Sequence, residues 1–134
     1  MKKQKVYYAH CMAIYHTEEE KSDIETLKRM GFDVVNPNED PHSDKAMTMR
    51  ARGKSRSEIM DYFVDVVEEC DGLAFRALDN MSISAGVGKE IRAMYKKGGF
   101  VIELPKYEKR NVLSVNETRG IVMAARNKGD RGNR

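Results

Sequence analysis

Apolar positions in this chain alternate between short continuous runs and helical stripes. The runs are KVYYA at 5–9, FDVVNP at 32–37, GLAFRA at 72–77 and FVIEL at 100–104. Short apolar runs rich in β-branched and aromatic residues are typical of buried strands. A further short strand is predicted at 112–115, which gives five strands in all.

Residues with helical spacing separate these strands. Thr17 and Glu20 form a predicted capping box, and Gly31 ends that helix. Ser57 and Ser84 are predicted to cap the second and third helices, and a last helix is predicted from Asn116. The predicted inward faces are Ile24, Leu27 and Met30 in the first helix, Ile59, Phe63, Val66, Val67 and Cys70 in the second, and Val87, Ile91 and Met94 in the third.

Residues 38–56 are polar and are predicted to form a long connection. Long loops in compact domains are often functional. The segment carries a basic run of Lys45, Arg50, Arg52, Lys54 and Arg56. This run is either a solvated loop or a flap that supplies positive charge to a phosphate.

Strands that alternate with helices predict a parallel α/β sheet with helices on both faces. Ligands of such sheets bind beyond the carboxyl ends of the strands, near the switch in strand order. Three segments occupy that position: 10–16, 36–56 and 77–90. Candidate binding residues are therefore expected there.

The composition fits one soluble domain. The chain has 134 residues, which suffices for a single core over 1–126, and its basic tail at 127–134 is predicted to be disordered. A net charge of +3 is too small to predict nucleic-acid binding. We see no membrane span or signal peptide, and Cys11 and Cys70 lack metal-ligand spacing. A cytoplasmic protein with free thiols, no metal and no cofactor is expected.

The stretch SISAGVGKE at 82–90 carries the most specific chemistry. Gly86 and Gly88 let a ligand approach the backbone, while Ser84 lies at a helix N-terminus, which favours anions. Glu90 shares a helix face with Gly86 and could act as a nucleophile at a sugar anomeric carbon. The alternative is a tight turn that only allows close strand–helix packing.

Four motifs resemble the nucleoside 2-deoxyribosyltransferase superfamily in content and order. They are YYAH at 7–10, NPNED at 36–40, CDGLAF at 70–75 and SAGVGKEI at 84–91. The last is the specific one and is most similar to the phosphate loop and catalytic glutamate of the deoxynucleoside 5′-monophosphate N-glycosidases. The resemblance covers about 5–104.

The resemblance implies a flavodoxin-like, Rossmann-like three-layer sandwich with strand order 2-1-3-4-5. It implies a nucleoside or nucleotide substrate, cleavage or transfer at an N-glycosidic bond, and Glu90 as nucleophile. A 5′-phosphate would be held by Ser84 and by backbone amides of the following residues, Ala85, Gly86, Val87 and Gly88. It also implies a homo-oligomer, and Ile121, Val122 and Met123 offer an apolar run on the last helix.

The chain departs from the family at two places. The first loop, usually glycine-rich, reads AHCMAIYH, so His10 and Tyr15 are expected to alter recognition of the base or sugar. The family aspartate on the second helix would fall near Phe63, and we favour the neighbouring Asp61 over Asp65 as the second carboxylate. Without such a group the leaving base has no obvious acid.

The remaining candidates have structural alternatives. His10 is a ligand contact or a structural hydrogen-bonding residue, and Tyr15 is a pocket lid or part of the core. Asn36 is a turn residue or a contact to the base, and Asp71 is a cap or a substrate contact. Three functions follow: an N-glycosidase or deoxyribosyltransferase, a non-catalytic nucleotide or nucleotide-sugar sensor, or a structural subunit.

Overall fold

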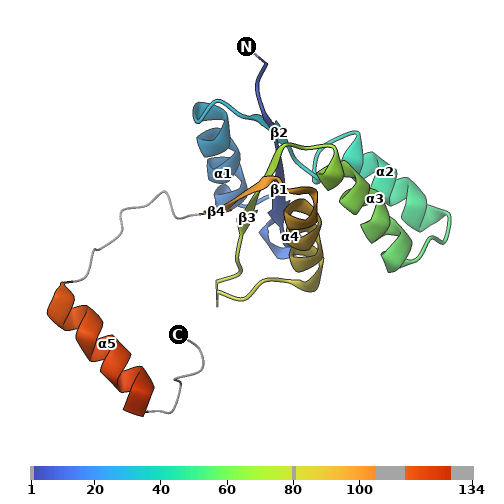
Figure 1. The fold of residues 1–134 in the computed structure, drawn as a ribbon. Coiled ribbons are helices and arrows are strands. Elements are labelled where there is room, and N and C mark those ends of the chain that lie inside the picture. The colour runs from blue at the N-terminus through green and yellow to red at the C-terminus, as the bar shows by residue number, and fades with distance from the viewer. Residues whose placement is uncertain (1, 80, 105–113, 128–134) are drawn as a thin grey trace.

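The structure is a computed structural model that describes residues 2–79, 81–104 and 114–127. Its sheet contains β1 (Lys5–His10), β2 (Asp33–Val35), β3 (Gly72–Arg76) and β4 (Phe100–Leu104). All pairings are parallel and the order is β2-β1-β3-β4 (Figure 1). The predicted α/β architecture with a parallel sheet is therefore confirmed.

The sheet of the described residues has four strands rather than the five predicted. Residues 112 and 113 of the predicted fifth strand lie outside the described part of the chain. Val115, the last residue of that prediction, instead begins a helix. Ser114 caps this helix by exchanging hydrogen bonds with Glu117, so a capping signal decides the local structure here.

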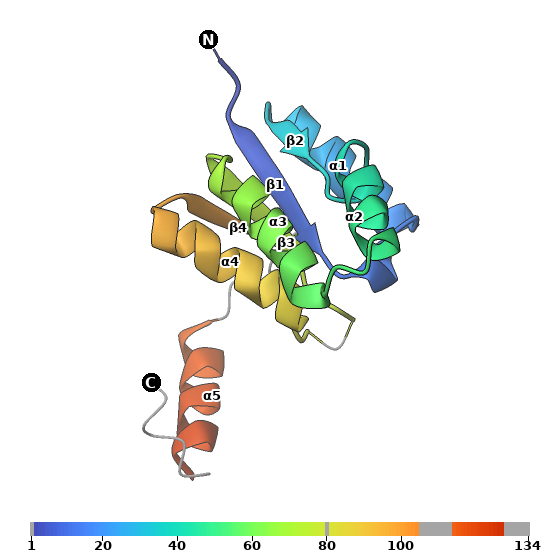
Figure 2. The same cartoon turned by 90° about the vertical axis from the view of Figure 1, so that its right-hand side faces the viewer.

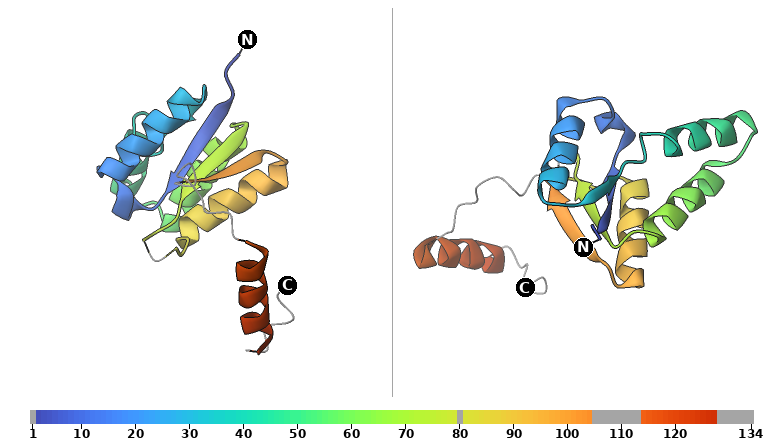
Figure 3. Two further views of the ribbon diagram at one scale, coloured as in Figure 1. Left: turned by 90° about the vertical axis from the view of Figure 1, so that its left-hand side faces the viewer. Right: turned by 90° about the horizontal axis from the view of Figure 1, so that it is seen from above.

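Helices cover both faces of the sheet. Figures 2 and 3 show α1 on one face and α3 and α4 on the other. The helices are α1 (Glu18–Arg29), α2 (His42–Ala51), α3 (Arg56–Glu68), α4 (Ala85–Lys97) and α5 (Val115–Asn127). This arrangement gives three layers with a separate apolar core on each side of the sheet.

Alternation along β1 sends its side chains to these two cores. Tyr8 packs with Leu27 on the α1 side, whereas Tyr7 packs with Leu73 and Met94 on the α3–α4 side. All five side chains are fully buried. Successive side chains of a strand point to opposite faces, so two neighbouring tyrosines serve two different environments.

The long polar connection predicted at 38–56 contains the helix α2. This helix buries only Ala46 among its residues, so its sequence has no apolar stripe that would have revealed it. The cap of α3 is Ser55 rather than Ser57. Ser55 exchanges hydrogen bonds with Glu58 in a capping box, a spacing that Ser57 lacks.

The start of α1 also differs from the prediction. The Thr17 hydroxyl accepts the Glu20 N–H at 3.2 Å, but the Glu20 carboxylate accepts the N–H of His16 instead of that of Thr17. Glu20 is therefore half of a capping box, and its carboxylate is available to other partners. Met30, predicted to face inward, is 53% exposed because α1 ends before it, at Arg29.

Helix α5 buries none of its residues, and Figure 3 shows it apart from the sheet. Val115, Ile121 and Met123 on this helix are more than half exposed. Self-association through this helix stays a prediction. Of the tail predicted at 127–134 to be disordered, Asn127 is the last residue of α5, and 128–134 lie outside the described residues. Among the described residues, no helix is both long and apolar enough to cross a bilayer.

Candidate functional site

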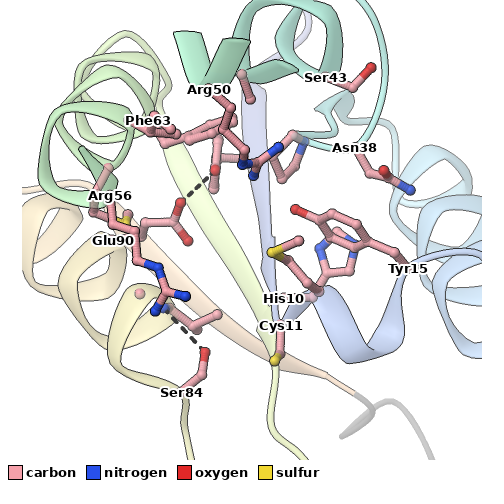
Figure 4. A pocket seen from close by; sticks show the side chains of 18 of the residues that line it. His10, Cys11, Tyr15, Asn38, Ser43, Arg50, Arg56, Phe63, Ser84 and Glu90 are labelled. Atoms are coloured by element: carbon pink, nitrogen blue, oxygen red, sulfur yellow. Dashed lines mark hydrogen bonds between the residues drawn. The ribbon is translucent and has the colours of Figure 1, made fainter. Parts of the chain in front are cut away.

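A cavity of about 640 Å³ opens at the carboxyl end of β1, where the chain switches from β2 on one side to β3 on the other. This is the place where parallel α/β sheets bind their ligands. The lining comes from β1, the 3₁₀ helix η1 (Met12–Ile14), the loop after β2, and α2, α3 and α4 (Figure 4). It consists of Tyr7, His10, Cys11, Met12, Tyr15, Pro37, Asn38, Ser43, Ala46, Met47, Arg50, Arg56, Ile59, Met60, Phe63, Ser84, Gly86, Val87 and Glu90.

Glu90 contributes a carboxylate to this cavity from the second turn of α4 and is only 6% exposed. The Tyr7 hydroxyl donates a hydrogen bond to Glu90 Oε2 at 2.5 Å. No salt bridge to a described residue compensates the charge of Glu90. Burial raises the pKa of Glu90 to about 7, although the hydrogen bond from Tyr7 opposes this shift.

Tyr7 is a site residue that the sequence analysis missed. Its strand was interpreted as a buried apolar run and as the family-like motif YYAH, and neither interpretation assigned a role to the Tyr7 hydroxyl. Burial, followed by the charge and hydrogen bond of Glu90, raises the pKa of Tyr7 well above its usual value. The phenol therefore keeps its proton and acts as a donor to Glu90. Counting which β1 residues share the α4 face would have identified it.

The N-terminus of α4 borders the same cavity. Ser84 is the N-cap, and its hydroxyl accepts the Val87 N–H at 3.5 Å. The Gly88 N–H donates to the Ser84 carbonyl, so the amides that make no hydrogen bond to a described residue are those of Ala85 and Gly86. Of the four amides predicted to hold a phosphate, those of Ala85 and Gly86 are therefore free in the described part of the chain, whereas those of Val87 and Gly88 bond to Ser84.

The two glycines of this motif are helical rather than part of a loop. A Cβ at Gly86 would meet only the Met60 sulfur at 3.5 Å, and one at Gly88 would make only ordinary contacts. Gly86 lines the cavity, whereas Ala85 is exposed and neither it nor Gly88 is part of the lining. Sterics inside the protein therefore do not require glycine at either position.

His10 forms part of the opposite wall and is held on several sides. Its Nε2 lies 2.8 Å from Glu20 Oε2 and its Nδ1 lies 2.9 Å from the Tyr8 carbonyl oxygen. The ring stacks on Tyr8 at a centroid distance of 3.8 Å, and the Tyr15 ring lies against it at 4.9 Å. His10 is thus both a structural hydrogen-bonding residue and part of the cavity wall.

Glu20 connects this wall to the neighbouring loops. It accepts hydrogen bonds from the His16 N–H at 3.1 Å and from Asn38 Nδ2 at 3.1 Å, besides its contact with His10. Burial raises the pKa of Glu20, but these hydrogen bonds outweigh burial and lower it overall. Glu20 therefore stays ionised and fixes three segments around the cavity.

Tyr15 is half-buried and faces the cavity. Its hydroxyl makes no hydrogen bond to a described residue, and Figure 4 shows it turned into the open space. Burial, then the charges of Glu90 and Glu20, raise the pKa of Tyr15 to about 12. It is thus a protonated donor at neutral pH, placed at the cavity as predicted.

Two cations complete the lining. Arg50 comes from the last turn of α2, and Arg56 is the first residue of α3. Neither forms a salt bridge with a described residue. Figure 4 shows Arg56 extending toward Ser84. Of the predicted basic run, these two residues therefore face the cavity, which favours the interpretation as a charged flap.

Asp61 does not reach the cavity, contrary to our expectation for the second carboxylate. It is exposed and absent from the lining, as is Asp65. The α3 residues that face the cavity are Arg56, Ile59, Met60 and Phe63. At 100° per residue, Asp61 lies on the far side of the helix from them, and Phe63 presents an apolar ring instead.

Asn36 and Asp71 also lie away from the cavity lining. Asn36 is 5% exposed and accepts the Asn38 N–H at 3.0 Å, which makes it a turn residue. Asp71 precedes β3, so it lies at the opposite edge of the sheet, where it accepts the Lys5 N–H at 2.8 Å. Their neighbours Pro37 and Asn38 line the cavity in place of Asn36.

The cavity thus combines a buried carboxylate, a helix N-terminus, two arginines and a phenol. Within the described residues, no group of three or more His, Cys, Asp or Glu side chains is positioned to hold a metal ion. A comparison with protein-family models found no match for this chain, and a comparison with curated proteins found no relative.

Proposed function

We propose that this protein cleaves or transfers at the N-glycosidic bond of a deoxynucleoside 5′-monophosphate or related nucleoside, with Glu90 as the nucleophile. The observation that carries the proposal is the Glu90 carboxylate, buried in the cavity wall and held by Tyr7 at 2.5 Å. Such a carboxylate can capture the oxocarbenium-like centre that forms when the base departs.

The immediate surroundings of Glu90 suit a nucleophile better than a structural residue. Tyr7 holds Oε2, while Oε1 makes no hydrogen bond to a described residue. One oxygen is thus oriented and the other can attack. A pKa near 7 leaves a substantial ionised fraction at neutral pH, and the absence of a cationic partner among the described residues preserves its nucleophilicity.

The other end of the cavity suits a phosphate. The α4 N-terminus offers the amides of Ala85 and Gly86 and the hydroxyl of Ser84, and Arg56 extends toward it. Helix N-termini and arginine both favour phosphate oxygens. Glu90 lies about one and a half turns further along the same helix, so a phosphate at Ser84 would bring the attached sugar toward the carboxylate.

The motif SAGVGKEI contains all of these α4 groups and is the segment that resembles the N-glycosidase branch of the nucleoside 2-deoxyribosyltransferase superfamily. A flavodoxin-like, Rossmann-like sandwich is compatible with the strand order β2-β1-β3-β4. The resemblance rests on the motifs and their order along the chain, and the cavity geometry adds the positions of the groups that surround Glu90.

The test is incubation of the purified protein with the four 2′-deoxynucleosides, their 5′-monophosphates and the matching ribonucleotides, with free base measured by chromatography. We expect base release from at least one deoxynucleotide, faster than from its nucleoside. Ser84→Ala should raise KM for the monophosphate about tenfold and leave the nucleoside almost unaffected. Absence of release from every compound would reject the enzymatic proposal.

A second candidate is a non-catalytic module that binds a nucleotide or nucleotide-sugar in the same cavity. The observation that favours it is Phe63, which lines the cavity where a second carboxylate was expected, while Asp61 faces outward. Calorimetric titration with the same monophosphates separates the two. Binding without base release by the wild-type protein would support the module and exclude the enzyme.

A further inference from the structure

Glu90 is the one carboxylic acid among the described lining residues, so a group of another kind must protonate the departing base if the proposed function, on which this inference rests, is right. The groups among the described lining residues that can carry an acidic proton are Glu90, Cys11, the His10 imidazole and the phenols of Tyr7 and Tyr15. Both ring nitrogens of His10 are already engaged, one with Glu20 Oε2 at 2.8 Å and the other with the Tyr8 carbonyl oxygen at 2.9 Å. Glu90 is the nucleophile, and the Tyr7 proton is committed to Glu90. The lining therefore leaves few groups that can deliver a proton.

We propose that the Tyr15 hydroxyl donates the proton to the leaving base. Its hydrogen has no acceptor among the described residues, and Figure 4 shows the phenol and the Glu90 carboxylate facing the cavity from opposite sides. Attack on an anomeric carbon requires the nucleophile and the leaving group on opposite faces of the sugar. A sugar between the two walls would thus present its base to Tyr15.

The phenol is positioned by its neighbours before any ligand arrives. Its ring lies against His10, which is fixed between Glu20, the Tyr8 carbonyl and the Tyr8 ring. A donor held in this way loses little conformational entropy when the substrate binds. With a pKa near 12, Tyr15 is protonated throughout the neutral range, which is the state that a donor needs.

Arg50 also lines the cavity. Its positive charge lowers the pKa of Tyr15, in opposition to the larger effect of burial. A guanidinium can hydrogen-bond to a base but does not release its proton. Arg50 therefore supports the transient phenolate that remains after the transfer, whereas the proton itself comes from Tyr15.

The steps balance as follows. Glu90 Oε1 forms a bond to the anomeric carbon, the carbon–nitrogen bond breaks, and its electron pair goes to the base, which takes the Tyr15 proton. Water then attacks the same carbon and gives a proton to the Tyr15 phenolate. The ester to Glu90 breaks and the carboxylate returns. The net reaction is nucleotide plus water to base plus sugar phosphate.

The experiment compares two leaving groups in wild-type protein and in Tyr15→Phe. The first substrate is the 2′-deoxynucleoside 5′-monophosphate that the wild type cleaves fastest. The second is 4-nitrophenyl 2-deoxy-β-ribofuranoside 5-phosphate, because nitrophenolate leaves without a proton. We expect the Phe variant to lose about 100-fold or more in kcat on the nucleotide and less than about threefold on the nitrophenyl compound.

The matched control is Tyr95→Phe, since Tyr95 is 64% exposed and is not part of the cavity lining. It should change neither rate. Equal losses on both substrates would make Tyr15 a positioning residue and overturn the inference, and so would full activity of Tyr15→Phe. Absence of release from both substrates by the wild type would instead reject the proposed function, and the inference with it.

Discussion

Tyr7 and Tyr8 are neighbours on β1, yet their hydroxyls serve two different carboxylates. Tyr7 donates to Glu90 and Tyr8 donates to Asp23, each at 2.5 Å. Asp23 is fully buried and also accepts two hydrogen bonds from Arg76, at 2.6 and 2.9 Å. Both carboxylates are buried and both are held by a phenol, but within the described part of the chain only Asp23 has a cationic partner.

This difference separates a structural carboxylate from a chemically available one. Both oxygens of Asp23 accept hydrogen bonds, from Tyr8 and from its ion-pair partner Arg76, and none of these three residues lines the cavity. Glu90 keeps a free oxygen, a cavity in front of it and a pKa near 7. A similar hydrogen bond from the same strand therefore has different consequences, depending on whether a cation neutralises the acceptor.

The largest effect is expected for Glu90→Gln. The amide keeps the shape and can accept the Tyr7 hydrogen bond, but it has no nucleophilic oxygen. Base release should fall at least about a thousandfold, while the affinity for a 5′-monophosphate stays within about threefold of wild type. Single-turnover base release and calorimetric titration measure the two quantities. Normal turnover by this variant would reject the nucleophile assignment.

Asp23→Asn should act on stability rather than on chemistry. Removal of the charge takes away the buried carboxylate with which Arg76 forms an ion pair at 2.6 Å, which we expect to lower the free energy of unfolding by about 3 kcal/mol. Urea denaturation measures this loss, and Asp65→Asn, at an exposed position of α3, is the control. A loss of base release per folded molecule comparable to that of Glu90→Gln would erase the proposed distinction.

Glu90→Gln should also stabilise the protein, and the sign depends on pH. Because the pKa of Glu90 is raised from 4.5 to about 7 in the folded state, its contribution to stability is fully present below pH 4.5 and is lost as pH rises through 7. Above that pH the buried charge destabilises the fold. The variant should gain about 3 kcal/mol at pH 8.5 and little near pH 4.5.

Chemical denaturation at both pH values measures this gain. The charge of Glu90 raises the pKa values of Tyr7 and Tyr15, and both phenols stay protonated over this range, so neither contributes to the slope. A variant that is less stable than wild type at pH 8.5 would mean that the Glu90 charge has a partner in solution.

The smallest effect is expected for the matched pair Tyr7→Phe and Tyr8→Phe. Loss of the Tyr7 hydroxyl removes the hydrogen bond that lowers the Glu90 pKa. The midpoint at which kcat/KM for base release rises with pH should therefore move upward by about one unit. Tyr8→Phe should leave that midpoint near pH 7 and lower only stability. Equal shifts in both variants would contradict the assignment of each phenol to one carboxylate.

The sequence was sufficient to predict the four strands of the described sheet and the helix α4, but not to exclude the predicted fifth strand, whose last residue, Val115, begins α5. Strands in a parallel sheet are buried on both faces and stand out as apolar runs, and β4 occupies the predicted 100–104. Ser84 caps α4 as predicted, because its hydroxyl lies three residues before an amide in the first turn. The helical spacing of Gly86 and Glu90 also predicted that they share a helix face, and both line the cavity.

The parts that were missed depend on contacts between distant segments. Nothing local in the β1 sequence distinguishes Tyr7 from a core residue, since its partner Glu90 is 83 positions away. Helix α2 has no apolar stripe because Ala46 is its one buried residue, and it contributes Ser43, Ala46, Met47 and Arg50 to the cavity lining. Asp61 was chosen because it lies close in sequence to Phe63, where the family has its aspartate. Two residues along a helix correspond to about 200°, so Asp61 points away from the face that Phe63 presents to the cavity.

The hydrogen bonds of Glu20 hold one wall of the cavity more firmly than α2 is held. Its carboxylate bonds to the end of β1, the loop before α1 and the loop after β2, so the side chains of that wall are held in place before a ligand binds. The part of the lining that comes from α2 is held by fewer buried contacts, because Ala46 is the one buried residue of this helix. A ligand meets the first wall already ordered, so the entropy lost on binding falls mainly on α2 and its Arg50.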